Sequence, residues 1–273
     1  MSVPPLTNLT FNSGLGGSTG AKKFKNTTDK YWVVKRSEKG HGGSEQVEIE
    51  FAANEIYEAV GIPVPKHALM KDSKGKPVLV LEYIDGKLLR DATPEEYEKA
   101  KEELKQGFVM DALLANWDVI GLGQDNILLP ADGSPAVRID NGGTLIFRAQ
   151  GGRKKFTADV TDIDTLRNKR IPSYAPILFG DLTNEEIQKQ IDTLIKPNME
   201  LILSKTPEAL RPVMKVRMDY LIERFQDINN QSGGKRNKIQ NIKSRKRSIH
   251  KTVRRRIHKK RTIKREYRRN KNL

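Results

Sequence analysis

The chain has 273 residues, of which 36% are hydrophobic, so it is long enough to bury a core in one or two domains. It has no cysteine, which excludes disulfides and thiolate metal sites, and its four histidines argue against a histidine-rich metal site. No apolar run approaches the roughly 20 residues of a membrane span, and the N-terminus lacks the pattern of a signal peptide. We expect a soluble intracellular protein of the cytoplasm or nucleus; packaging in a viral particle is also compatible with the sequence.

The net charge of +16 is concentrated at one end of the chain. Residues 235–273 hold 19 of the 50 Lys and Arg residues but only one of the 34 acidic residues, Glu266. The rest of the chain is therefore close to neutral. The composition changes at "NNQSGGK", a polar linker that contains glycine. We expect a globular body over residues 1–232 and a separate basic tail over residues 233–273.

The first third of the chain is rich in predicted strands. Gly14, Gly16, Gly17 and Gly20 punctuate a loop between two strands, the second being "KYWVVKR". The periodicity of "SEQVEIEFAANEIYEAVG" predicts a helix that ends at Gly61. Two further strands are expected around a turn at residues 72–75, and these elements define an N-lobe over residues 1–86.

Helix signals dominate afterwards and define a C-lobe over residues 87–232. Thr93 and Glu96 form a capping box, Thr183 and Glu186 offer a second, and Thr206 precedes a proline as a third N-cap would. Between the first two boxes, "AVRIDNGGTLIF" is typical of a strand, a sharp turn and a second strand.

Polar residues interrupt several apolar segments in a fixed order. Lys35 ends "WVVK", Asp118 and Asn126 bracket a glycine-containing loop in "LLANWDVIGLGQDNILL", and Asp140 ends "VRID". A glycine turn, a strand lysine, an Asp, an Asn and a second Asp are the parts used for phosphoryl transfer from ATP. Backbone N–H groups of the turn approach phosphates. The lysine neutralises the phosphate charge, one Asp orients the acceptor hydroxyl, and the Asn and last Asp hold Mg²⁺.

Each part alone has an ordinary structural interpretation. The loop is not a Walker A motif, because Ala21 stands where lysine is required, and it is not G-x-G-x-x-G, because Thr19 occupies the last glycine position. Lys35 and Arg36 resemble an exposed basic pair, and Asp140 begins what could be a hairpin turn. The order and spacing of the whole set favour the phosphotransfer interpretation.

The segments "GGSTGAKKF", "YWVVKR", "EFAANEIYEAVGIPVP", "LVLEYIDG", "LLANWDVIGLGQDNILL" and "RIDNGGTLIFRAQG" resemble the atypical protein-kinase-like family. This family includes GSTG-loop kinase-like domains of prokaryotes and viruses, phosphatidylinositol 3- and 4-kinases, and actin–fragmin kinase. The resemblance covers about residues 12–200. It implies an α+β, two-lobed protein-kinase-like fold with a strand-rich N-lobe and a helical C-lobe; the basic C-terminal tail lies outside it.

The resemblance also implies a role for each matching residue. The nucleotide would be bound by a phosphate loop, by Lys35 with Glu50 as its helix partner, and by a hinge segment that contacts adenine. The loop consists of Gly16, Gly17, Ser18, Thr19 and Gly20, and the hinge consists of Glu82, Tyr83 and Ile84. Glu55 is the alternative partner of Lys35. Asp118 would be the catalytic aspartate and Lys35 a second catalytic residue, Asn126 and Asp140 the metal ligands, and Asn116 a brace for the loop.

Three departures from ordinary protein kinases concern the catalytic loop and the substrate. Asn126 follows Asp118 by eight residues instead of five, so Asp125 remains an alternative base. The H-R-D motif and a later A-P-E motif are both missing. The acceptor therefore cannot be taken over from ordinary protein kinases.

These observations predict an ATP- and Mg²⁺-dependent kinase whose acceptor is most simply a protein Ser/Thr. A phosphatidylinositol or inositol lipid acceptor is the nearest alternative, and a non-catalytic kinase-shaped scaffold is the second. The charge of residues 235–273 predicts binding to nucleic acid or another polyanion, with an anionic membrane surface as the alternative. Tyr267 is the only aromatic residue there, which argues against base stacking.

Overall fold

The computed structural model describes residues 2–16, 20–36 and 43–226. A compact unit ends at Gln226. The predicted residues Gly17, Ser18 and Thr19 and the basic tail lie outside the described residues. No helix in the described ranges is long and apolar enough to cross a bilayer.

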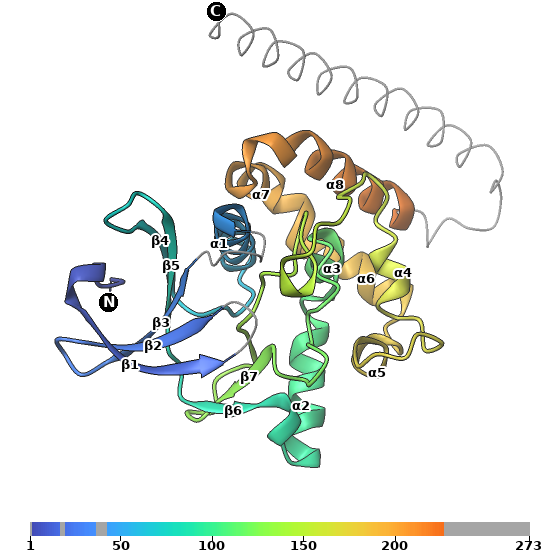
Figure 1. Cartoon of the computed structure of the whole chain (residues 1–273). Coiled ribbons are helices and arrows are strands. Elements are labelled where there is room, and N and C mark those ends of the chain that lie inside the picture. The colour runs from blue at the N-terminus through green and yellow to red at the C-terminus, as the bar shows by residue number, and fades with distance from the viewer. Residues whose placement is uncertain (1, 17–19, 37–42, 227–273) are drawn as a thin grey trace, which may run out of the picture. The chain divides into compact units, whose positions relative to one another are not determined.

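The N-terminal part is a five-stranded antiparallel sheet in the order β1-β2-β3-β5-β4, covered by one long helix (Figure 1). Its elements are β1 Leu9–Gly16, β2 Ala21–Asn26, β3 Tyr31–Arg36, α1 Gly43–Ala59, β4 His67–Lys71 and β5 Pro77–Glu82. The predicted helix and the β4–β5 hairpin are confirmed. One prediction was wrong: the glycine loop joins β1 to β2, so β3 is the third strand and not the second. The strand β2, "AKKFKN", was missed because its three lysines break the apolar alternation.

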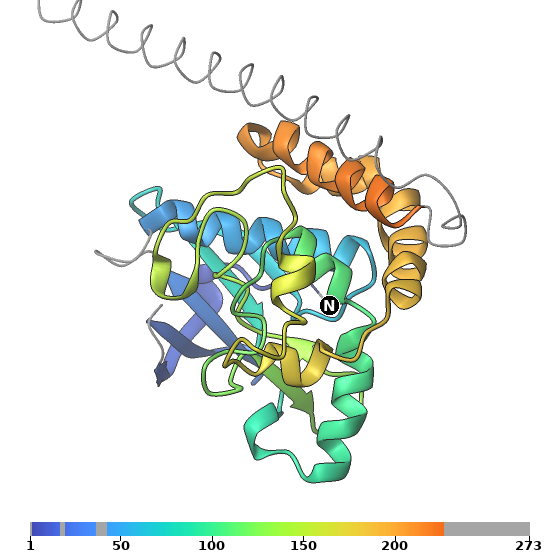
Figure 2. The same cartoon turned by 90° about the vertical axis from the view of Figure 1, so that its right-hand side faces the viewer.

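The C-terminal part is mostly helical and carries a small antiparallel sheet, β6-β7-β8. Its elements are β6 Gly86–Leu88, α2 Pro94–Lys105, α3 Phe108–Leu113, β7 Ile127–Pro130, β8 Val137–Arg138, α4 Asp162–Thr165, α5 Ala175–Phe179, α6 Asn184–Gln190, α7 Met199–Lys205 and α8 Arg211–Phe225. Figures 1 and 2 both show α1 next to α7, so α1 touches both parts of the unit.

Two of the three predicted helix caps are confirmed. The side chains of Thr93 and Thr183 accept from the N–H groups of Glu96 and Glu186, and both capping boxes are complete. Thr206 is not an N-cap. It ends α7, and its buried hydroxyl donates to the carbonyl oxygen of Ile202. The 3-10 turn that follows begins at Glu208 with Pro207 in its N-cap position, so Thr206 lies one residue too early to cap it.

The predicted strand after Asp140 does not form. The Thr144 hydroxyl donates to the carbonyl oxygen of Asn141 at 2.8 Å and closes a local turn. The Leu145 N–H then donates to the carbonyl oxygen of Leu114 at 2.7 Å. This backbone is therefore tied to the end of α3, and only the single bridge between Phe147 and Arg153 follows.

Candidate functional site

A cavity of about 520 Å³ is lined by both parts of the unit. The apolar part of its lining comes mainly from β1, β3, β5, β7 and the segment around β8, and most of the polar part from residues singled out in the sequence. The apolar residues include Leu15, Val33, Leu81, Leu128 and Ile139; the polar residues include Lys35, Glu82, Asp125, Asn126 and Asp140. Among the described residues, this cavity gathers most of the predicted site.

Lys35 reaches this cavity because side chains alternate along a strand. In β3, Trp32 and Val34 pack into one core cluster, while Val33 packs on the opposite face with Leu81 and the α1 residue Val47. Lys35 follows the same alternation and shares the face of Val33. The apolar pattern of "YWVVK" thus places one lysine under α1.

The Lys35 ammonium lies between two carboxylates. Its Nζ is 2.6 Å from Glu50 Oε1 and 3.1 Å from Asp140 Oδ1. Burial lowers the pKa of Lys35, but Asp140 and Glu50 together outweigh burial and hold the pKa above its ordinary value. Glu55, the alternative partner, bonds instead to Lys205 of α7 at 2.5 Å. The geometry therefore selects Glu50.

Asp118 and Asn126 are joined across their loop. Asn126 Nδ2 donates to the backbone carbonyl oxygen of Asp118 at 2.6 Å, which leaves Asn126 Oδ1 available to a ligand. Gly121 has φ +76°, and a Cβ there would lie 2.3 Å from Asp125 Oδ1, so glycine is needed for this turn. The segment from Asp118 to Asn126 therefore forms a closed loop, which keeps Asn126 beside the Asp118 backbone.

The electrostatic environment of Asp118 differs from that of Asp125. Burial, with the nearby Asp140 carboxylate, raises the pKa of Asp118 to about 6. Asp125 lies 4.0 Å from the Arg90 guanidinium. The pKa of Asp118 is therefore moved towards neutrality, as a proton acceptor requires.

Asn116 is buried below this loop and does not line the cavity. Its Nδ2 group donates to the Tyr57 hydroxyl at 3.2 Å and to Asn141 Oδ1 at 3.3 Å. It thus connects α1 with the segment after Asp140.

The segment Glu82, Tyr83 and Ile84 lines the cavity where β5 ends. The N–H groups of Glu82 and Tyr83 donate to the carbonyl oxygens of Lys66 and Tyr31. Among the described residues, the Ile84 N–H has no hydrogen-bond partner. Of the predicted phosphate loop, Gly16 ends β1 and Gly20 precedes β2, and the pairing of Gly16 with Ala21 places the two ends of the loop side by side.

Lys154 is a candidate functional residue that the sequence reasoning missed. Its Nζ donates to the carbonyl oxygens of Ala115 and Gly143, the latter at 2.7 Å, and lies 4.7 Å from the centre of the Trp117 ring. Burial lowers its pKa to about 7, although Asp118 is among the carboxylates that raise it. It ties the Asp118 loop to the segment after Asp140. Its only sequence signal was a basic run, "GGRKK", which looks like a solvated loop.

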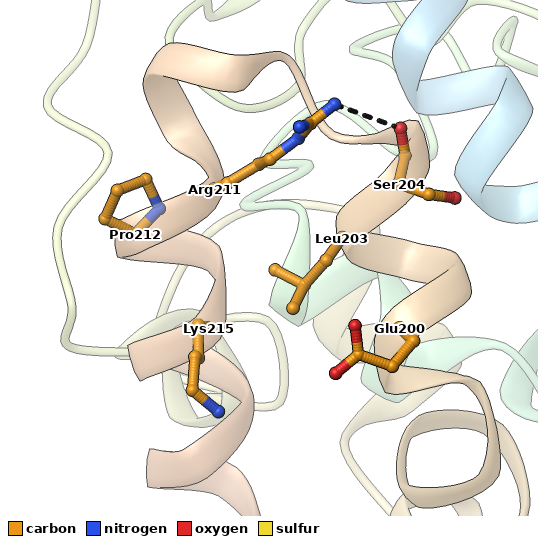
Figure 3. Close-up of a pocket in the computed structure, with 6 residues that line it drawn as sticks. All are labelled: Glu200, Leu203, Ser204, Arg211, Pro212 and Lys215. Carbon is orange, nitrogen blue, oxygen red and sulfur yellow. Dashed lines mark hydrogen bonds between the residues drawn. The ribbon is translucent and has the colours of Figure 1, made fainter.

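A second cavity, of about 430 Å³, lies between α7 and α8 (Figure 3). The Arg211 guanidinium donates to the Ser204 carbonyl oxygen at 3.4 Å. Lys215 pairs with Asp219 of its own helix at 3.8 Å and not with Glu200. Of these two cavities, only the first is lined by a buried lysine that pairs with carboxylates.

The described unit has an α+β, two-lobed protein-kinase-like fold, as the sequence predicted. Its structure is similar to the crystal structure of a Helicobacter pylori proinflammatory kinase, CtkA, with a TM-score of 0.51 over 81% of this chain and 94% of that chain. The two sequences are 16% identical, so the likeness is one of fold. Comparison of the sequence with protein-family profiles and with curated proteins gives no match.

Proposed function

We propose that this protein is an ATP- and Mg²⁺-dependent phosphotransferase whose acceptor is a protein Ser or Thr hydroxyl. One observation carries the proposal: Lys35 is buried between Glu50 and Asp140 at a cavity formed by both lobes. A strand lysine held by a helix glutamate and a carboxylate on the next lobe is the arrangement that positions nucleotide phosphates in kinases.

The nucleotide would lie with its base on the apolar lining and its phosphates near Lys35. Val33, Leu81 and Leu128 supply apolar surface for a base, and the unpartnered Ile84 N–H supplies a donor to a ring nitrogen. The loop from Gly16 to Gly20 would bring backbone N–H groups to the phosphates.

The residues present fit a hard divalent cation. Asn126 Oδ1 and the Asp140 carboxylate are oxygen ligands of the kind that Mg²⁺ prefers. Asp140 is 40% exposed and is one of two carboxylates around a single lysine, so negative charge remains for a cation. When bound, Mg²⁺ would offset the charge on the phosphate oxygens.

Asp118 would position the acceptor hydroxyl. In the transfer step the hydroxyl oxygen forms a bond to the γ-phosphorus, the bond to the bridging oxygen of ADP breaks, and the hydroxyl proton passes to Asp118. Lys154 would hold the Asp118 loop in place through its bonds to Ala115 and Gly143.

The test is transfer of radiolabelled γ-phosphate with Mg²⁺, comparing the wild type with Asp140→Ala in the presence of protein acceptors and, separately, phosphatidylinositol vesicles. We expect label on protein, lost in the variant. Label on lipid alone would show that the acceptor is a lipid and not a protein. No transfer from a folded wild type would favour the non-catalytic scaffold.

The tail carries a separate proposal, which rests on composition. We propose that residues 235–273 form a polyanion-binding region distinct from a two-lobed body of residues 1–86 and 87–232, with nucleic acid as the ligand. With 19 basic residues, its affinity for DNA should fall steeply with salt. Electrophoretic mobility shifts of the full chain and of a chain ending at residue 232 would test this, and equal binding by the two would contradict it.

A further inference from the structure

A cluster of three side chains lies away from the interlobe cavity, where α1 ends and β4 begins. Glu55 and Glu58 belong to α1, and His67 is the first residue of β4. One ligand atom from each lies within 4.8 Å of the others. None of the three lines the cavity described above.

The hydrogen bonding of His67 defines its tautomer. Its Nδ1 lies 2.9 Å from the carbonyl oxygen of Pro65, which can only accept, so Nδ1 carries the hydrogen. Its Nε2 is buried and has no hydrogen-bond partner, and the side chain is only 1% exposed. This nitrogen is therefore shielded from water and lies beside two carboxylates.

The shorter of the two nitrogen–oxygen distances favours a shared metal ion over a proton in this cluster. Nε2 lies 3.3 Å from Glu55 Oε1 and 4.0 Å from Glu58 Oε2. A charge-assisted bond from an imidazolium to a carboxylate is about 2.7 to 2.9 Å long. Two ligand atoms at about 2.0 to 2.1 Å from one tetrahedral ion lie about 3.3 Å apart.

We infer that Glu55, Glu58 and His67 bind a divalent transition-metal ion of the Zn²⁺ type. Imidazole nitrogen with two carboxylate oxygens is a ligand set that zinc accepts, with a fourth position left for water. The Glu58 side chain is 61% exposed, so the ion can enter from solvent. The bound ion would fasten the last turn of α1 to β4.

Lys205 limits the affinity of this site without occupying it. Its Nζ contacts Glu55 Oε2, the oxygen that does not face His67. The contact orients the glutamate, as bonds to metal-ligating carboxylates commonly do, but its positive charge opposes a second cation. Removal of this charge by Lys205→Gln should therefore tighten metal binding.

The experiment uses the full chain without nucleotide and titrates Co²⁺, whose visible d–d absorption reports coordination, followed by displacement with Zn²⁺. We expect one equivalent to bind, with a band that is lost in His67→Gln and in Glu58→Gln. Because Glu58 is exposed, its variant keeps the fold intact; circular dichroism verifies this. At a hundredfold excess over Kd, Zn²⁺ should raise Tm by about 5 to 10 °C.

Two controls exclude other metal-binding groups. Asp140→Asn removes the proposed Mg²⁺ ligand, and a triple variant replaces the remaining histidines, His41, His250 and His258, by Gln. Both should keep the band. A band that survives in His67→Gln, or an absence of any Co²⁺ binding by the wild type, would overturn the inference. Neither outcome bears on phosphate transfer, so the metal-site proposal and the kinase proposal can be contradicted independently of each other.

Discussion

Two clusters of buried charges each include a residue of α1 and one from the segment around β8, and they differ in how completely their charges are matched. Arg138 donates from Nε and Nη2 to both oxygens of Asp111, at 2.8 and 2.7 Å, and Tyr57 of α1 adds a third bond. Lys35 instead faces two carboxylates, Glu50 and Asp140. The first pair is balanced and closed to solvent; the second leaves negative charge at a cavity.

This difference in charge balance suits the first cluster to a structural role and the second to ligand binding. A fully satisfied pair with no exposed member offers nothing to a ligand, and its removal leaves a buried unpaired charge. An unbalanced pair with one carboxylate in a cavity favours an additional cation. Glu50 and Tyr57 lie seven residues apart, two turns along one face of α1, so the same helix takes part in both networks.

The largest effect on stability is expected for Arg138→Met. The variant leaves Asp111 buried without its partner and should lose about 3 to 5 kcal/mol of unfolding free energy, measured by urea denaturation. The double variant Arg138→Met/Asp111→Leu should recover much of this loss, because an apolar pair leaves no uncompensated charge. A loss below about 1 kcal/mol in the single variant would show that the two networks do not differ in this way.

Lys35→Met should affect catalysis more than stability. We expect a fall in kcat of about 100- to 1000-fold, as for loss of one transition-state donor. The loss of stability should be smaller than for Arg138→Met, because Asp140 contacts solvent and burial raises the pKa of Glu50 to about 7, which lets it take up a proton. Lys22→Met, at an exposed position of β2, is the matched control and should retain activity.

Lys154→Met should lower kcat by about 10- to 100-fold, because a small displacement of a positioned catalytic group is costly. The side chain donates to the carbonyl oxygens of Ala115, before Asp118, and Gly143, after Asp140. The neighbouring Lys155 is exposed, and Lys155→Met should be neutral in the same steady-state assay. Equal activity of the Lys154→Met and Lys155→Met variants would show that Lys154 does not contribute to the candidate site.

The smallest effect concerns pH. Because burial and Asp140 raise the pKa of Asp118 to about 6, its ionised form is lost as the pH falls through 6. We expect kcat/KM to decrease about tenfold per pH unit below that point. In Asp125→Asn the inflection should move to lower pH, because the Asp125 charge contributes to the shift. Abolished transfer in this variant would instead make Asp125 the base.

Much of the fold could be predicted because its signals are local. The caps at Thr93 and Thr183 and the end of the helix near Gly61 depend on residues within one turn of each other. The missed strand β2 has the opposite property: its lysines project from a sheet whose existence depends on β1 and β3 on either side.

By itself, the sequence determined the order of the chemical groups: the glycine loop, Lys35, Asp118, Asn126 and Asp140. Only the tertiary structure decided which groups are partners. Glu50 and Glu55 lie on one helix, five residues and so about 140° apart, and only the packing of α1 shows which one faces Lys35. The pairing of Arg138 with Asp111 and the place of Lys154 were undetermined for the same reason, because electrostatic partners are chosen by distance in space and not by separation along the chain.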